Sequence, residues 1–185
     1  MMTMLQLGGF LLVSAGIIYV SLASLRQPRS HGFYRFWAWE AILALAVMNA
    51  PVWFREPFAW HQIISWLLLI LCLVPLVLGL RLLRQARRAR AERADAALLD
   101  FEKTAELVTT GIYGYIRHPM YSSLLLLAWG VFFKAPSWPG IALAAIATGS
   151  LIATAKVEER ENVRFFGPSY ESYMKRTKMF VPFIL

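Results

Sequence analysis

Long apolar stretches separated by short polar segments dominate the pattern of this chain. A helix that crosses a bilayer needs roughly 20 mostly apolar residues. Five stretches meet or approach that length, at residues 5–25, 36–54, 60–83, 119–134 and 138–157. Pro75, late in the third stretch, predicts a kink there. The pattern therefore predicts an all-α, polytopic membrane protein with about five transmembrane helices.

The composition favours a bilayer over water as the main solvent. Hydrophobic residues make up 58% of the 185 residues, and charged residues only 16%. A soluble domain of this length could not bury so much apolar surface, so we expect one integral membrane domain over residues 1–185, with the lipid bilayer as its partner. The net charge of +8 lies between the apolar blocks. That pattern is typical of loops facing anionic headgroups, and we expect no nucleic-acid binding.

The basic residues are distributed unequally between the two sides of the predicted bundle. With five spans, all of the 19 Lys and Arg residues except Arg55 and Lys134 fall on one side. The positive-inside rule makes that side cytosolic. We therefore expect a protein of the bacterial inner membrane, with the N-terminus outside and the C-terminus in the cytosol. Residues 1–25 have no Lys or Arg before the apolar run, which favours a retained first helix over a cleaved signal.

Polarity divides the chain into three parts. Residues 1–84 hold three N-terminal spans, and residues 85–106 form a cytosolic amphipathic connector that is too polar to cross the bilayer. Residues 107–185 hold a helical hairpin, a Gly-Pro break at 167–168 and a short amphipathic segment, SYESYMKR. The apolar end of the chain, 179–185, is expected to lie in the membrane interface.

Polar residues suited to chemistry gather first in the loop before the fourth span. Gly111 permits backbone conformations that other residues avoid, and Pro119 suits the first turn of a helix. Unpaired N–H groups at that helix start favour an anion. Three side chains would surround the position: Arg117, His118 and Tyr121. An interfacial anchor is the alternative, because Tyr, Arg and His are all favoured at headgroup depth.

A second polar group follows the fifth span, on the same predicted side of the membrane. Glu158 and Glu159 come directly after the apolar helix, where carboxylates are costly unless they are solvated or paired. Both oppose the helix dipole, which indicates a cationic partner. Glu158 and Asn162 share one helix face, whereas Glu161 is expected to pair with Arg164 at the surface.

These two groups carry a resemblance to a known family. The strings GIYGYIRHPMY and EER…FFGPSYESYMKR…FVPF, one hydrophobic span apart, resemble the isoprenylcysteine carboxyl methyltransferase family, part of a wider group that includes the phospholipid N-methyltransferases. The resemblance covers about residues 100–185 and implies S-adenosylmethionine binding at the cytosolic membrane face. It implies that the cofactor is bound by Gly111, Tyr113, His118, Pro119, Tyr121, Glu158 and Glu159. Ser123, where relatives have Gly, and Asn162, where they have an apolar residue, would alter the pocket wall.

Methyl transfer from such a cofactor is a displacement that a protein accelerates mainly by alignment. We expect an amphiphilic or lipid-linked substrate that enters from the lipid, with carboxylate O-methylation favoured and lipid amine N-methylation next. An amine would also need a base, for which His118 or a glutamate could serve. Three arginines are candidate catalytic residues that would steer an anionic headgroup, and the pattern does not choose among them: Arg117, Arg160 and Arg164.

Two other functions fit the same pattern. Sterol reductases that use a nicotinamide cofactor have a related membrane architecture, so an NADPH-dependent reductase is one alternative. A non-enzymatic membrane accessory protein is the other.

The remaining polar residues favour structural roles. His31 and His61 adjoin predicted helix ends and are expected at the interface. Glu40 and Asn49 could line a substrate cavity, and a helix–helix hydrogen bond is equally expected for Asn49. Cys72 is expected to be an inert packing thiol. The three histidines lie far apart in the sequence, so no metal site is expected.

Overall fold

The computed structural model describes residues 3–89 and 107–183. Its elements are α1 (Met4–Leu25), α2 (His31–Asn49), η1 (Ala50–Val52), α3 (Trp60–Leu71), α4 (Leu73–Ala89), η2 (Gly111–Gly114), α5 (Pro119–Phe132), α6 (Trp138–Phe166) and α7 (Pro168–Arg176). The only strand pairing among the described residues is one isolated parallel bridge, between Ile116 and Lys178. The all-α prediction is confirmed. Residues 90–106, most of the predicted connector, lie outside the described residues.

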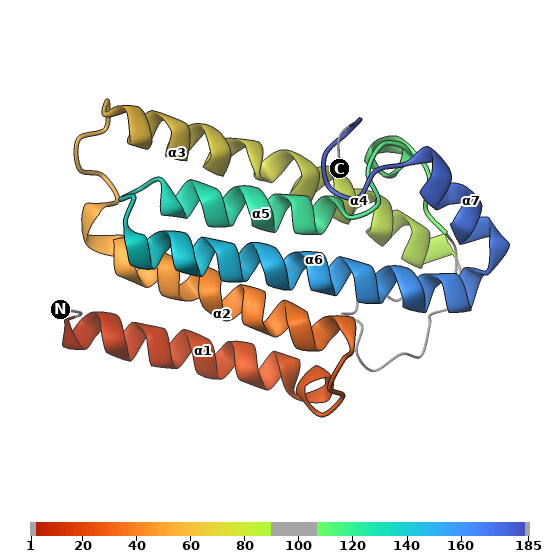
Figure 1. Ribbon diagram of the computed structural model, residues 1–185, viewed down its shortest axis with the longest axis horizontal. Helices are drawn as coiled ribbons and strands as arrows, with labels where there is room; N and C mark the ends of the chain where they lie inside the picture. The colour runs from red at the N-terminus through yellow and green to blue at the C-terminus, as the bar shows by residue number, and fades with distance from the viewer. Residues whose placement is uncertain (1–2, 90–106, 184–185) are drawn as a thin grey trace.

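The long helices lie side by side in one bundle (Figure 1). α1 packs on α2 at one edge, α6 packs on both α2 and α5, and α5 packs on α3 and α4 at the other edge. Small residues such as Ala41, Ala128 and Ala147 are buried where α2, α5 and α6 meet. Small side chains let helix backbones approach closely, which is the usual packing device of helices in membranes.

Three helical segments are long and apolar enough to cross a membrane: Met4–Leu25, Trp60–Ala86 and Trp138–Phe166. The fourth predicted span is α5, a shorter apolar helix. Large apolar side chains point outward from these helices, among them Leu12 at 76% exposure and Ile70 at 61%. Such a surface is stable in lipid and not in water. The chain is therefore an integral membrane protein built as a helical bundle.

The boundaries predicted for the second span, 36–54, are wrong at both ends. The corresponding helix, α2, begins at His31, because the Ser30 side chain accepts a hydrogen bond from a backbone N–H of the first turn and caps the helix there. It ends at Asn49, because Pro51 in the following 3-10 turn cannot continue an α-helix.

The fifth predicted span is also longer than expected. α6 continues past residue 157 to Phe166, and it ends at Gly167, whose φ of 59° favours glycine. The extension places the second polar group, which includes Glu158 and Glu159, on a continuous helix. The carboxylates of that string are therefore positioned by the bundle itself and not by a loop.

The end of the bundle opposite α7 has its own buried polar cluster. Lys134 is 1% exposed, and its ammonium lies 3.5 Å from the centre of the Trp66 ring and donates to Gln62 Oε1 at 3.0 Å. The cation–π contact and the hydrogen bond offset the cost of burying this charge. Asn49 donates to the Val131 carbonyl at 2.8 Å, so the helix–helix hydrogen bond expected of it is present.

Two further side chains inside the spans are satisfied locally. The Ser14 hydroxyl of α1 lies 3.0 Å from both carboxylate oxygens of Glu40, which ties α1 to α2. Cys72 is buried, and its thiol donates to the Leu69 carbonyl at 3.0 Å. Glu40 therefore joins two helices, and Cys72 is bonded within its own helical segment.

Candidate active site

The loop before α5 is joined to the C-terminal tail by backbone hydrogen bonds. The N–H of Arg117 donates to the Lys178 carbonyl at 2.8 Å, and the N–H of His118 donates to the Met179 carbonyl at 3.1 Å. In return the N–H of Lys178 donates to the Tyr115 carbonyl at 3.0 Å. The tail thus fixes the backbone of two predicted site residues.

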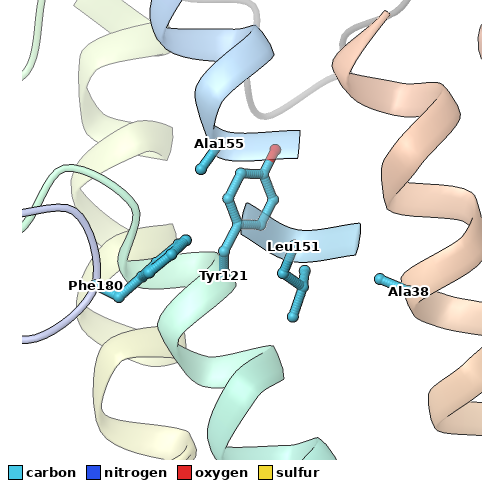
Figure 2. Packing of buried hydrophobic residues seen from close by; sticks show 5 residues of the cluster. All are labelled: Ala38, Tyr121, Leu151, Ala155 and Phe180. Atoms are coloured by element: carbon cyan, nitrogen blue, oxygen red, sulfur yellow. The ribbon is translucent and has the colours of Figure 1, made fainter. Parts of the chain in front are cut away.

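The first part of the terminal apolar stretch is buried in the bundle, and its place in the membrane interface stays a prediction. Phe180 is 2% exposed and packs with Tyr121, Leu151 and Ala155 (Figure 2). Its carbonyl accepts a hydrogen bond from the Ser122 hydroxyl at 2.7 Å. Burial of the aromatic ring and this hydrogen bond together hold Phe180 in the bundle.

α7 packs against the same loop. The buried Tyr173 hydroxyl donates to the Tyr113 carbonyl at 2.7 Å. Burial raises the pKa of Tyr173, so the phenol stays protonated and remains a donor. Gly111 begins the 3-10 turn of this loop with a φ of 59°, and a Cβ there would lie 2.8 Å from Leu82 of α4. The turn therefore favours glycine for its conformation, and a larger residue would also have to displace the end of the Leu82 side chain.

The polar side chains at the start of α5 converge on the two carboxylates of α6, Glu158 and Glu159. The Tyr121 hydroxyl donates to Glu158 Oε2 at 2.6 Å, and Arg117 Nε donates to Glu159 Oε1 at 2.6 Å. The His118 ring lies between the two glutamates, with Nδ1 at 3.8 Å from Glu158 Oε2 and Nε2 at 3.4 Å from Glu159 Oε1. The structure thus brings Arg117, His118 and Tyr121 into one cluster with both glutamates.

The cluster is largely shielded from solvent. The rings of His118 and Tyr121 stack with centroids 5.4 Å apart, and His118 itself is 4% exposed. His118 occupies the N-cap position of α5 without a side-chain capping hydrogen bond, and Pro119 occupies the first turn as predicted. His118 Nε2 is buried and has no hydrogen-bond partner within the described ranges, since its contact with Glu159 lacks hydrogen-bond alignment. A buried ring nitrogen of this kind is costly unless a ligand or water satisfies it.

Tyr170 of α7 borders the same carboxylates. Burial raises the pKa of Tyr170, and the negative charge of Glu158 raises it further. Its hydrogen bond with Asn162 acts in the opposite direction. The face shared by Glu158 and Asn162, predicted from their spacing, therefore points toward α7.

The three candidate arginines lie in different surroundings. The Arg117 guanidinium is bonded to Glu159 and also donates to the Met174 and Thr177 carbonyls of the tail, so it serves the architecture of the site. Arg160 and Arg164 are exposed on α6, and neither has a hydrogen bond or ion pair with another described residue. Contact of any of the three with a substrate stays a prediction.

The pairing predicted between Glu161 and Arg164 is wrong. Glu161 Oε2 lies 2.5 Å from Nδ1 of His31, the first residue of α2. His31 is fully buried, and its predicted position at interface depth stays a prediction. A tertiary contact between α2 and α6 replaces the local pair, because burying the imidazole requires a partner for its polar nitrogen.

A cavity of about 530 Å³ adjoins the cluster between α6, α7 and the tail, and sequence reasoning did not find it. It is lined by Arg117, Ile152, Lys156, Met174, Thr177, Lys178, Met179 and Phe180. Lys156, which directly precedes the polar residues at the end of α6, could have indicated a polar site here. No local pattern predicts that the tail folds back to form a wall of the cavity. The described residues contain no group of three or more potential metal ligands.

Comparison with known proteins points to one family. A family described as phospholipid methyltransferase matches residues 67–169, which include the convergent residues of α5 and α6. A methanethiol S-methyltransferase of Crocosphaera subtropica is 29% identical over 76 residues, which are 41% of this chain and 29% of that protein. A protein-S-isoprenylcysteine O-methyltransferase of Schizosaccharomyces pombe is 34% identical over 79 residues, which are 42% of this chain and 34% of that protein.

A third relative, protein-S-isoprenylcysteine O-methyltransferase B of Arabidopsis thaliana, is 32% identical over 116 residues, which are 60% of this chain and 58% of that protein. The chain thus spans between 29% and 58% of the length of these curated relatives. No solved structure matches the chain.

Proposed function

The chain belongs to the phospholipid methyltransferase family, and on that premise we propose that it is an S-adenosylmethionine-dependent membrane methyltransferase acting on an amphiphilic or lipid-linked substrate. The observation that carries this proposal is the convergence of Tyr121 on Glu158 and of Arg117 on Glu159, both at 2.6 Å. Residues from the loop before α5, from α5 and from α6, which are far apart in sequence, form one polar cluster at the end of apolar helices.

The donor set of the cluster fits the chemistry of this cofactor. An ammonium group and ribose hydroxyls need carboxylate acceptors, which Glu158 and Glu159 supply. The side chain of Glu158 is 20% exposed against 9% for Glu159, so Glu158 is the more accessible acceptor. A carboxylate needs donors, and His118 Nε2 is a buried ring nitrogen available to a ligand. The N–H groups at the start of α5 add further donors.

The chain contributes alignment and shielding to the reaction. When bound, the cofactor supplies a methyl group on a sulfonium, which passes to a substrate oxygen while the electron pair of the broken C–S bond stays on sulfur. Correct alignment alone can lower the barrier by about 7–11 kcal/mol. Tyr121 holds the Glu158 carboxylate in one orientation, and Arg117 does the same for Glu159. The buried rings of His118 and Phe180 exclude water from this position.

Carboxylate O-methylation fits this site better than amine N-methylation. A carboxylate attacks without losing a proton, and the opposite charges of nucleophile and sulfonium neutralise each other in the transition state, which a dry pocket favours. An amine would have to give up its proton, and His118 is the base within the cluster that could take it. The distribution of Lys and Arg supports a cytosolic position for the site, and the bacterial inner membrane stays a prediction.

Calorimetry on the full chain in detergent tests the proposal. S-adenosylmethionine should bind and NADPH should not, and Glu158→Gln should weaken the binding of S-adenosylmethionine roughly tenfold, the effect of losing one charge-assisted contact. Glu171→Gln is the matched control, because Glu171 is an exposed carboxylate on α7 outside the cluster.

Two results would contradict the proposal. Binding of NADPH in place of S-adenosylmethionine would support a reductase. Absence of binding to both, with an intact fold, would support a non-enzymatic accessory role.

A further inference from the structure

The cavity beside the cluster carries two lysines that the proposed methyl transfer does not use. Lys156 of α6 and Lys178 of the tail both line it, and both are exposed. Neither ammonium has a hydrogen bond or ion pair with another residue in the described ranges. Arg117 also lines the cavity, but its charge is balanced by Glu159. The cavity therefore presents two uncompensated positive charges and attracts an anion.

The other walls of the cavity are mostly apolar. Ile152, Met174, Met179 and Phe180 form them. The volume of about 530 Å³ lies within the roughly 300–1,000 Å³ typical of small-molecule sites. A pocket lined by exposed cations and by thioether, aromatic and aliphatic side chains fits a molecule that has a charged head and an apolar body.

An exposed strip on α6 continues from this cavity toward the other end of the bundle. Ala142, Ala145 and Gly149 are exposed and fall on the same helix face as Ile152 and Lys156. A Cβ placed on Gly149 would meet no atom within 4 Å, so the surface there is open. Because α6 is long and apolar enough to cross a membrane, an alkyl chain can lie along this strip in the lipid.

We propose that the cavity is the binding site for a single-chain amphiphile with a carboxylate head. Lys156 and Lys178 bind the carboxylate, and the strip on α6 holds the chain. The assignment of this molecule as the methyl acceptor rests on the proposed function. Arg117 and Phe180 are shared by the cavity and the cluster, and Phe180 lies 6.2 Å from the His118 ring, so a carboxylate bound here is next to the proposed transfer site.

Palmitate labelled with ¹³C at its carboxyl group is the probe, with methyl palmitate as the uncharged comparison. The full chain is placed in phosphatidylcholine nanodiscs, and binding is followed by the carboxyl NMR signal. Palmitate should bind, and methyl palmitate should not compete with it. Lys156→Gln combined with Lys178→Gln should weaken palmitate binding roughly tenfold, the factor expected when two exposed ion pairs are lost. Lys175→Gln, an exposed lysine of α7 outside the cavity, should change binding less than about twofold.

The outcomes separate this proposal from the previous one. Unchanged palmitate affinity in the double variant would overturn the lysine site, as would displacement of palmitate by phosphatidylglycerol at equal concentration. S-adenosylmethionine affinity is measured on the same samples and should not change in the double variant. A parallel tenfold loss there would mean that the lysines bind the cofactor carboxylate, which overturns the substrate assignment. If the wild-type chain bound palmitate through these lysines and did not bind S-adenosylmethionine, the proposed function would fail and the cavity site would stand.

Discussion

Replacing Arg117 with methionine should destabilise the fold at the α7 end of the bundle. Arg117 Nε lies 2.6 Å from Glu159 Oε1, and both side chains are 9% exposed. Arg117→Met would leave the Glu159 charge buried without its main partner. Removing one partner of a buried ion pair costs about 3–5 kcal/mol. Because the Glu159 side chain keeps 9% exposure and can be partly hydrated, we expect the lower end, about 3 kcal/mol.

The assay is thermal unfolding in detergent, followed by tryptophan fluorescence. A loss of about 3 kcal/mol in a chain of this size corresponds to a Tm lower by about 6–12 °C. The variant also loses the donors to the Met174 and Thr177 carbonyls, so limited proteolysis should cut the tail sooner. The exposed Arg176 on α7 provides the control, and Arg176→Met should shift the Tm by less than about 2 °C.

A second variant decides whether the stranded charge is the cause. Arg117→Met combined with Glu159→Gln removes both charges, so it should recover a large part of the lost stability, with a coupling of about 1.5–3 kcal/mol between the two changes. A Tm for Arg117→Met within about 2 °C of the wild type would refute the reasoning. A double variant whose loss equals the sum of the two single losses would refute it as well, because the residues would then be independent.

Three further predictions follow from single contacts. Tyr121→Phe removes the donor that orients Glu158 and should weaken S-adenosylmethionine binding about three- to tenfold by calorimetry, with little change in Tm; an unchanged Kd would contradict this. His31→Ala breaks the buried contact with Glu161 and should lower the free energy of unfolding by about 2 kcal/mol in thermal unfolding. An unchanged free energy of unfolding would show that this contact does not stabilise the fold. Burial raises the pKa of Tyr173 above its unfolded value, so its contribution to stability should be complete below pH about 10 and lost as pH rises beyond that. The Tm of Tyr173→Phe should therefore fall less steeply above pH about 10 than the Tm of the wild type. An equally steep fall would contradict this prediction.

The helices could be predicted from the sequence because a membrane-spanning helix needs an apolar run of a defined length, and these runs have that length. The first and third runs gave the bounds of α1 and the start of α3 closely. The start of α2 was missed because it depends on the Ser30 cap and on the burial of His31, which lies outside the apolar run. Helix ends that are fixed by tertiary contacts do not appear in a hydrophobic pattern.

The site was predictable only in part, for a similar reason. Residue spacing placed Glu158 and Asn162 on one face and put His118 at the start of a helix, and both features are present. The tail as a wall of the site was not predictable, because its bridge joins Ile116 to Lys178 across the three intervening helices α5, α6 and α7. The partner of Glu161 was missed on the same ground, since a local pattern offers Arg164 and only the folded bundle offers His31.

A double-mutant cycle on S-adenosylmethionine affinity most directly tests whether Tyr121 of α5 and Glu158 of α6 bind the same ligand together. Calorimetry is performed on the wild type, on Tyr121→Phe, on Glu158→Gln and on the double variant. The account predicts that each single change weakens binding and that the double change costs less than the sum by about 0.5 kcal/mol or more, because the two side chains act as one unit. Binding that is unaffected by either change, or losses that add fully, would contradict it.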